Sequence, residues 1–394
     1  MDTPVYSPRL GLFVKRHSRT LGHAAVTSRD PRSAALSALA PGAPTEQNAK
    51  RQSRTFAKGA PISVALTRSR WSLVDEAPER RDDRGMAAGA KAMTLTDAGL
   101  ETVLLFEEGV ELPCFAAFPL LDSDWGRAVL RRYYEPFLRL ARDSGAEFVL
   151  SSPTWRANRD WGEELGYDAA ALEAVNRRAV SFLEEMRDDV LAPGGRDRVV
   201  IEGCVGPRSD AYRPTLRMEV DQAERYHSAQ LQVLADAGCA QAAAITLSYA
   251  EEAVGIVSAA TAVGLPIVIG FTVETDGRLP SGDSIEQAID AVDRATDGAA
   301  QSYMLNCAHP THFADALPEG SARTRIHALR ANASMKSHEE LDAAVELDAG
   351  DPADLAERYV ALRRELPGLH VLGGCCGTDI RHVTAISDAW SAET

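Results

Sequence analysis

The sequence predicts an α/β fold of the (β/α)8 TIM-barrel class, on three observations. From Met93 onward, short β-branched or apolar runs alternate with longer amphipathic segments, as in repeated βα units around a parallel sheet. There are eight such runs, and residues 93–394 exceed the roughly 250 residues that such a barrel takes, which leaves room for loop insertions. No Gly-x-Gly-x-x-Gly pattern follows the first run, which disfavours the competing doubly wound open sheet.

The predicted elements alternate along the chain. In the first helix, Val129, Tyr133 and Phe137 belong to one apolar stripe at helical spacing, which predicts packing against the core. The expected strands are Met93–Asp97, Glu147–Ser151, Val199–Cys204, Ala242–Leu247, Pro266–Thr272, Ser302–Cys307, Ile326–Ala331 and His370–Gly374. The expected helices are Arg127–Ser144, Ala169–Asp189, Glu219–Ala237, Ala250–Val263, Ser284–Ala295, Asp351–Glu365 and Asp379–Trp390.

Residues 1–92 are expected to form a low-order extension ahead of a single domain, residues 93–394. They are rich in Ser, Ala, Arg and Pro and have no sustained hydrophobic period. Three explanations stay open: a targeting segment, a regulatory tail, or an unused upstream start with Met86 or Met93 as the true beginning. The Arg and Ser content resembles that of transit peptides, but acidic residues such as Asp2 favour the unused start or an inert tail.

Composition and charge limit the classes of function. The chain has 394 residues, 45% hydrophobic and 25% charged, which is ordinary for a soluble globular protein, and no apolar run approaches the roughly 18 residues that span a bilayer. Residues 1–92 carry 16 Lys and Arg against 8 Asp and Glu, a charge of about +8. Since the net charge of the chain is −15, the remaining residues carry about −23. This acidic body argues against nucleic-acid binding. We expect small-molecule partners and a cytoplasmic location, or an organellar one if residues 1–92 are a transit peptide; homo-oligomerisation stays open.

Three of the six cysteines give the clearest chemical signal. Six cysteines in a chain of this size do not indicate a secreted disulfide scaffold. Cys307 ends the sixth expected strand and Cys375 with Cys376 ends the eighth, and active sites of such barrels lie at the C-terminal strand ends. Three thiolates suit Zn²⁺ and leave one coordination position open, which is typical of a catalytic metal. Because a zinc-bound thiol stays deprotonated near neutral pH, this pattern points to alkyl transfer onto sulfur. The glycines that flank the cysteine pair are expected to let the backbone bend there.

Other residues near these strand ends could also bind metal. Cys204, at the end of the third strand, is expected to be a packed core cysteine. His309 and His312 follow Cys307 closely, but Pro310 and the onset of a helix favour a pocket wall or a helix cap over metal ligation.

The end of the first strand carries a candidate substrate site. The segment reads Thr96-Asp97-Ala98-Gly99-Leu100-Glu101-Thr102. A carboxylate beside glycine can hold a substrate ammonium while nearby backbone N–H groups take the substrate carboxylate. Asp97 could instead cap the next segment, but its place at the rim favours a substrate role for Asp97 and Gly99.

Together these motifs resemble the homocysteine S-methyltransferase family, a zinc-dependent (β/α)8 group. The similarity covers most of residues 93–390. Its most specific parts are Gly-Gly-Cys-Cys-Gly at 373–377 and Asn-Cys at 306–307, which match the zinc ligands of the family. Asp97-Ala98-Gly99 is similar to the family's Asp-Gly-Gly or Asp-Gly-Ala, in which the Asp helps to hold the amino acid.

The resemblance implies further substrate contacts and shows one departure. Thr154 follows the second strand, Thr246 lies at the end of the fourth, and Asn332 resembles an asparagine of the seventh. Family members commonly end the fourth strand with Glu-Thr, whose carboxylate contacts the substrate amine, whereas this chain has Ile245 there. Glu274, after the fifth strand, could supply the missing carboxylate; an acceptor without a free amine is the alternative.

The implied function is zinc-dependent transfer of a methyl group from a sulfonium or ammonium donor to a thiol, with homocysteine giving methionine. Catalysis would come from positioning and thiolate generation rather than from a general acid. The loop of residues 155–161, rich in Trp and Arg, is expected to wall the donor pocket through cation–π contacts. Two alternatives remain: a methyltransferase for another thiol or selenol, and a non-catalytic zinc-binding barrel.

Overall fold

The computed structural model describes residues 92–212 and 216–393. The predicted N-terminal extension, apart from Ala92, therefore lies outside the described residues, and its role stays a prediction.

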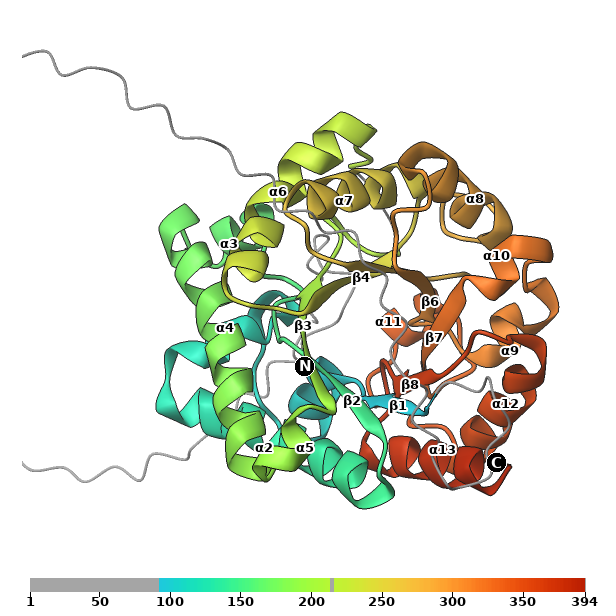
Figure 1. The fold of residues 1–394 in the computed structure, drawn as a ribbon, viewed down its shortest axis with the longest axis horizontal. Helices are drawn as coiled ribbons and strands as arrows, with labels where there is room; N and C mark the ends of the chain where they lie inside the picture. The colour runs from blue at the N-terminus through green and yellow to red at the C-terminus, as the bar shows by residue number, and fades with distance from the viewer. Residues whose placement is uncertain (1–91, 213–215, 394) are drawn as a thin grey trace, which may run out of the picture. The chain divides into compact units, whose positions relative to one another are not determined.

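Eight parallel strands of the described chain close into a barrel, in the order of the sequence (Figure 1). The first strand pairs with the second and with the last, which closes the ring. The predicted fold class is confirmed, and each predicted strand is present with its ends shifted by at most one residue. The strands are β1 (Thr94–Thr96), β2 (Glu147–Ser151), β3 (Val199–Val205), β4 (Gln241–Leu247), β5 (Ile267–Phe271), β6 (Ser302–Asn306), β7 (Ile326–Ala331) and β8 (Val371–Gly374).

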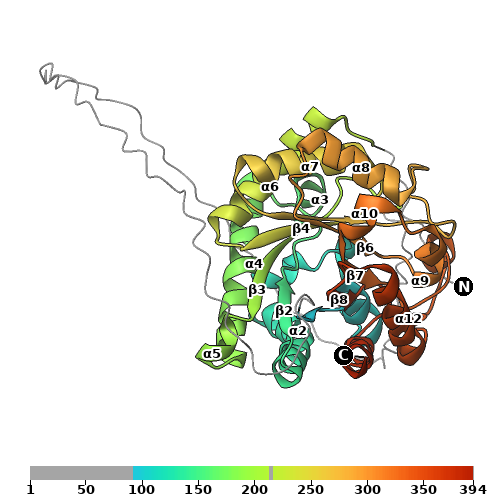
Figure 2. The same cartoon turned by 45° about the vertical axis from the view of Figure 1, so that its right-hand side comes forward.

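The longer helices lie outside the ring of strands, as Figures 1 and 2 show. Helix α2 begins three residues before its predicted start, because the side chain of Ser123 accepts a hydrogen bond from the Gly126 N–H and caps it. Its predicted stripe is buried, with Val129, Tyr133 and Phe137 at most 4% exposed. The longer helices are α2 (Asp124–Ser144), α4 (Ala169–Val190), α6 (Val220–Asp236), α7 (Ala250–Ala262), α8 (Ile285–Thr296), α12 (Pro352–Glu365) and α13 (Ile380–Ala392).

Short helical turns fill the loops, and the sequence did not predict them. Between β6 and β7 the chain forms only short helices in place of one long one, and turns also precede α2 and α12. The short elements are α1 (Leu100–Thr102), η1 (Val103–Glu107), η2 (Pro113–Phe115), η3 (Phe118–Asp122), α3 (Arg159–Glu164), α5 (Pro193–Arg196), α9 (Pro310–Phe313), η4 (Ala314–Ala316), α10 (Gly320–Thr324) and α11 (His338–Asp342). None of the described helices is long and apolar enough to cross a membrane.

Alternation along the strands decides which side chains enter the barrel. A small cluster of Ala243, Val268, Met304 and Ala328 is separate from the large core that packs strands against helices, and these residues fill the barrel interior. Because side chains two residues apart point to the same face, the next interior layer toward the C-terminal strand ends contains Ile245, Gly270, Asn306 and Arg330. The polar site is built on this layer.

Candidate metal centre and substrate cavity

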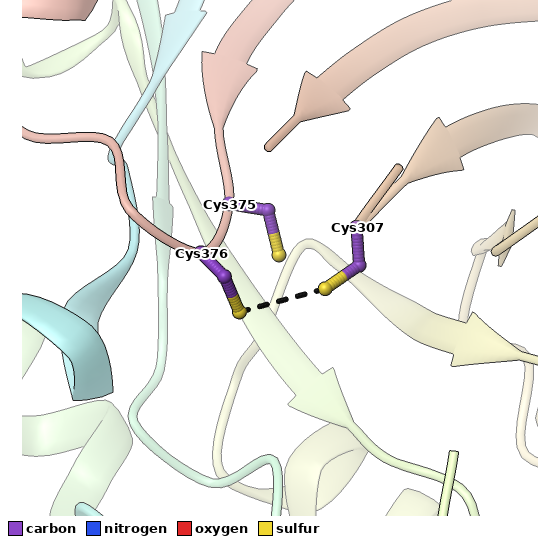
Figure 3. A group of neighbouring side chains, drawn as sticks. All are labelled: Cys307, Cys375 and Cys376. Atoms are coloured by element: carbon purple, nitrogen blue, oxygen red, sulfur yellow. Dashed lines mark hydrogen bonds between the residues drawn. The ribbon is translucent and has the colours of Figure 1, made fainter. Parts of the chain in front are cut away.

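Three cysteine sulfurs meet at the C-terminal ends of the strands (Figure 3). Cys307 directly follows β6, and Cys375 with Cys376 directly follows β8. The Sγ atoms of Cys307 and Cys376 are 3.5 Å apart, and all three Sγ atoms lie within 4.8 Å of one another. The structure thus brings together the three residues that the sequence singled out, and a set of three sulfurs this close can hold a metal ion.

The glycines around the cysteine pair serve close packing more than bending. A Cβ on Gly373 would lie 1.9 Å from the Thr96 hydroxyl oxygen, and one on Gly374 would lie 2.0 Å from that of Thr378. Among the three, Gly377 takes a positive φ, +79°. The expectation of a bent backbone therefore holds at Gly377, whereas the other two glycines let β8 approach its neighbours.

The Cys307 end of the cluster is held by Asn306 and Thr246. Cys307 and Thr246 both have positive φ, +56° and +62°, which is costly for residues with a Cβ and more so for a β-branched one. The Asn306 side chain secures this geometry: its Oδ1 accepts from the Thr246 N–H at 2.9 Å and its Nδ2 donates to the Thr246 hydroxyl at 2.8 Å. Gly270 makes room, since a Cβ there would lie 2.8 Å from Oδ1 of Asn306.

An aromatic pair covers the sulfur of Cys307. The rings of Tyr212 and His338 stack with centroids 3.9 Å apart. The Tyr212 hydroxyl lies 2.8 Å from Sγ of Cys307, and Nε2 of His338 donates to the carbonyl of Cys307 at 2.7 Å. Burial raises the pKa of Tyr212 well above its ordinary value, so this hydroxyl stays protonated and can donate to a thiolate.

The surroundings of the cluster favour a thiolate at Cys375 alone, because the hydrogen bonds and burial within the metal-free group raise the pKa of Cys307 and Cys376. Hydrogen bonds from the thiols of Cys307 and Cys376, followed by the nearby cation of Arg330, hold the pKa of Cys375 well below the ordinary value of a thiol. Arg330 projects from β7 and donates through Nε to the carbonyl of Gly374, one residue before the pair. Thiolates are the form that metals bind.

A cavity with a solvent-accessible volume of about 130 Å³ opens over the cluster, and all three cysteines line it. Of the residues expected to bind substrate, Asp97, Gly99 and Thr246 also line it. A Cβ on Gly99 would lie 2.5 Å from the carbonyl oxygen of Cys375, so glycine lets the loop after β1 approach the cysteines. Ile245 lines the cavity as well, and it presents an apolar wall where a carboxylate was expected from the resemblance.

Asp97 reaches the cavity with its carboxylate already engaged. The hydroxyl of Tyr133 donates to its Oδ2 at 3.0 Å and accepts from the N–H of Ala98, and Arg330 pairs with its Oδ1. Burial raises the pKa of Asp97, while Arg330 and Tyr133 oppose that shift. Oδ1 has no hydrogen-bond partner among the described residues besides this ion pair, so a substrate ammonium would share the carboxylate with Arg330 and Tyr133.

The other three expected contacts lie outside the residues that line the cavity. The Thr154 hydroxyl donates to the carbonyl of Cys204 at 2.7 Å, and the N–H of Asn332 donates to the carbonyl of Ala308. Oε1 of Glu274 lies 3.3 Å from Nδ1 of His338. Glu274 therefore contacts the ring that covers Cys307 and is not among the residues that line the cavity.

Several charged residues that line the cavity were missed by the sequence analysis, and two of them carry weight below. Glu101 and Arg156 both line it. Glu101 stood in the segment that pointed to Asp97, and Arg156 stood in the Trp-rich loop assigned to the donor. The signal that could have identified Arg156 is a charged residue between two aromatic ones. Glu101 reaches the cavity because it lies in the helical turn after β1, which the sequence analysis did not predict.

The histidines near Cys307 serve the local structure. His309 is the N-cap of α9, where its Nδ1 accepts from the Thr311 N–H, and Nε2 of His312 donates to the carbonyl of Met335. Neither belongs to the group of described side chains that could hold a metal with Cys307. The expected helix cap is what the structure shows at His309.

Comparisons with known proteins agree on one family. The family model described as homocysteine S-methyltransferase matches residues 94–390. The chain is 28% identical over 270 residues to a methionine synthase of Mycobacterium leprae, covering 66% of this chain and 20% of that protein. It therefore spans about a fifth of the length of that relative.

Solved structures share the fold. The homocysteine methyltransferase MmuM from Escherichia coli, in its metallated form, aligns with a TM-score of 0.60 and 18% identity over 76% of this chain and 96% of that one. Its oxidized form aligns with a TM-score of 0.61 and 19% identity over 77% and 97%.

Proposed function

The chain belongs to the homocysteine S-methyltransferase family, and we propose that it transfers a methyl group from a sulfonium or ammonium donor to a thiol, with homocysteine as acceptor and methionine as product. The observation that carries the proposal is the meeting of three cysteine sulfurs at the floor of a cavity, at the C-terminal end of a barrel. This is the face on which barrel enzymes carry their active sites.

Cys307, Cys375 and Cys376 would hold a zinc ion. The donor set supports this assignment, because three soft sulfur ligands suit zinc and leave one position for an exchangeable ligand. When bound, zinc would stabilise the acceptor thiol as its thiolate near neutral pH. The donor loses its positive charge on transfer, so this chain needs no strong general acid.

The protein's own contribution is to position the sulfurs. The hydrogen bonds of Asn306 fix Thr246 and, through the chain, Cys307. The stacked rings of Tyr212 and His338 cover one side of the cluster, and Glu274 supports His338 from behind. A fixed arrangement of this kind would lower the barrier mainly by orienting the reacting atoms.

Recognition of the amino group is assigned to Glu101 in place of Asp97 and Glu274. No side-chain hydrogen bond or ion pair joins Glu101 to another residue of 92–212 or 216–393, and Glu101 lines the cavity. Asp97 would then hold the cavity wall in place through its contacts with Tyr133 and Arg330. Ile245 supports a second candidate, a thiol or selenol acceptor that has no amine and packs against an apolar side chain.

We also propose that the chain works on small molecules, in the cytoplasm. The charge of about −23 on residues 93–394 supports the absence of a nucleic-acid partner, because it would repel phosphates. Fluorescence microscopy of the full-length protein carrying a fluorescent tag tests the location, and a signal from a compartment other than the cytoplasm would contradict it.

The test is direct detection of product. Zinc-loaded protein is incubated with homocysteine and, separately, S-methylmethionine, S-adenosylmethionine or betaine, and methionine is measured by mass spectrometry. Methionine that forms only with zinc, and is lost in Cys376→Ser, is the expected result. Bound zinc without methyl transfer to any thiol would leave a non-catalytic zinc-binding barrel; transfer to other thiols alone would identify another acceptor.

A further inference from the structure

A buried glutamate points into the barrel below the cavity. Glu202 lies on β3, beside Ser151 of β2 and Gln241 of β4 in the register of the strands. The neighbouring Ile201 packs into the core between strands and helices, so Glu202 points to the opposite face, the barrel interior. The residue is only 3% exposed. Burying a carboxylate is costly, so its place here indicates a specific role.

The two oxygens of Glu202 have different kinds of partner. Nε2 of Gln241 donates to Oε2 at 2.6 Å, while Oε1 of Gln241 accepts from Nε2 of Gln301 at 3.2 Å. This contact fixes the amide, so Gln241 faces Glu202 with its donor. Oε1 of Glu202 instead accepts from the Ser151 hydroxyl at 3.0 Å. Because a hydroxyl can donate or accept, Oε1 can gain a proton and keep this partner.

Ser151 connects the carboxylate to the cavity. It is one of the residues that line the cavity over the cysteine cluster, whereas Glu202 is not. Within the described chain, Oγ of Ser151 has no hydrogen-bond partner besides Glu202. The hydroxyl therefore stands between the carboxylate and the space that a substrate would occupy.

The surroundings of Glu202 suit a proton acceptor. Burial raises its pKa, and the hydrogen bond from Gln241, the charge of Arg330 and the hydrogen bond from Ser151 oppose that shift, while the charge of Asp97 adds to it. Two donors on the two oxygens are the pattern of an ionised carboxylate, which can still accept one proton at Oε1.

The proposed reaction releases a proton inside this cavity. A free thiol keeps its proton at neutral pH, since its ordinary pKa is about 8.5, whereas a thiol bound at the three cysteines would be a thiolate. The methyl donor takes up no proton, because it loses its positive charge as the methyl group leaves. One proton per acceptor thiol therefore needs an acceptor.

We propose that Glu202 takes this proton through Ser151. The S–H bond breaks and its electron pair stays on sulfur; the proton passes through water in the cavity to Oγ of Ser151, and the proton that Oγ held moves to Oε1 of Glu202. Ser151 then accepts from Glu202, and Gln241 still donates to Oε2. After the thioether leaves, the proton returns along the same path to solvent. This inference rests on the proposed function and adds two residues to it.

The experiment counts protons by calorimetry of homocysteine binding to zinc-loaded protein, without a methyl donor, in buffers of different ionisation heat near neutral pH. Glu202→Gln and Ser151→Ala should each release about one proton more per bound thiol than the unsubstituted protein, because the internal acceptor or its link is gone. Equal proton counts would overturn the assignment. A merely structural Glu202 would change stability and leave these counts equal.

Glu147→Gln is the matched control. Glu147 lies on the same face of β2 as Ser151, but it is exposed and is not among the residues that line the cavity. It should give the proton count of the unsubstituted protein. Glu101 is the competing acceptor, since it lines the cavity. An extra proton from Glu101→Gln with none from Glu202→Gln would assign the proton to Glu101 and overturn the proposal.

Infrared difference spectroscopy covers the case in which Glu202→Gln does not fold. Addition of homocysteine to the unsubstituted protein should produce the C=O band of a buried carboxylic acid, and Ser151→Ala should lack that band. No band in the unsubstituted protein would also overturn the proposal. A protein that shows these proton counts and yet methylates no thiol would contradict the proposed function and leave this inference standing. Methylation with equal counts in all variants would do the reverse, and absence of any thiol binding would overturn both.

Discussion

Nη2 of Arg330 lies 2.8 Å from Oδ1 of Asp97, and this ion pair joins β7 to the end of β1 beneath the cysteine cluster. Both side chains are at most 8% exposed. The same guanidinium donates to the carbonyls of Ala98 and Gly374, so one cation ties together the loops that carry the cavity wall and the cysteine pair. Through this ion pair, Asp97 at the rim of the barrel has a structural role in the site.

Removal of the cation should be strongly destabilising. Arg330→Met leaves Asp97 buried without its partner, and breaking a buried pair in this way typically costs about 3–5 kcal/mol. Urea unfolding followed by circular dichroism measures the loss. Arg131→Met, which breaks the exposed pair with Asp189, is the control and should cost at most about 1 kcal/mol. Equal losses in the two variants would show that the buried pair has no special role.

Asn306 should control the geometry of Cys307. Asn306→Ala removes the acceptor of the Thr246 N–H and should cost about 1–3 kcal/mol of stability, since a buried donor loses its partner. We also expect about a 10–100-fold loss of zinc affinity, the usual effect of removing a group that orients a ligand. Competition with a chromogenic chelator measures this, and Thr246→Ser, which keeps the hydroxyl, should bind zinc normally. An unchanged zinc affinity of Asn306→Ala would contradict the role of Asn306 in fixing Cys307.

The close approach of Gly99 to Cys375 should not tolerate a side chain. A Cβ there would lie 2.5 Å from a backbone oxygen, so Gly99→Ala forces the loop and the cysteine pair apart. We expect a loss of about 1–3 kcal/mol of stability and weaker zinc binding. Gly194→Ala is the control, because nothing lies within 4 Å of its Cβ position, and thermal unfolding with zinc titration compares the two.

Glu101 should make the stability of the metal-free protein depend on pH. Burial raises the pKa of Glu101 from 4.5 to about 7, so between these values the unfolded chain loses the proton first. Stability contributed at this site therefore falls as pH rises from 4.5 to about 7, by up to about 3 kcal/mol. Glu101→Gln should remove that slope, while Glu163→Gln, at an exposed position, should keep it. Unfolding free energies at pH 5 and 8 decide the matter; identical slopes in all three proteins would refute it.

Each of the three cysteines should be needed for metal binding. Cys376→Ser replaces a soft sulfur by a hydroxyl that zinc binds poorly, so bound zinc should fall from one ion per chain to nearly none after dialysis. Elemental analysis measures it. Cys114→Ser is the control, since Cys114 lies outside the cluster and should leave one zinc per chain. Full zinc in the Cys376 variant would remove that residue from the ligand set.

Much of the fold could be predicted because its signals are local. The apolar runs gave all eight strands, since a buried parallel strand reads as a short continuous run whatever its neighbours are. The short helices of 307–325 and of 103–122 were not predicted, because α, 3₁₀ or π helices of only three to five residues show no periodic pattern and are held by tertiary packing. Among site residues, the cysteines were found because strand ends of a barrel meet at one face, whatever the exact register.

By itself, the sequence determined the barrel, the family and the three sulfurs, because periodicity and motif spacing are properties of neighbouring residues. Only the tertiary structure decided which charges are free to bind a ligand. Asp97 reads as a free carboxylate in the sequence, but Arg330 of β7 pairs with it. Arg156 was expected in the wall of a donor pocket, and the structure buries it between two tryptophans, with no acceptor for its Nε and Nη1 among the described residues. Pairing of buried charges depends on the register between distant strands and on the course of their loops, and no local pattern records either.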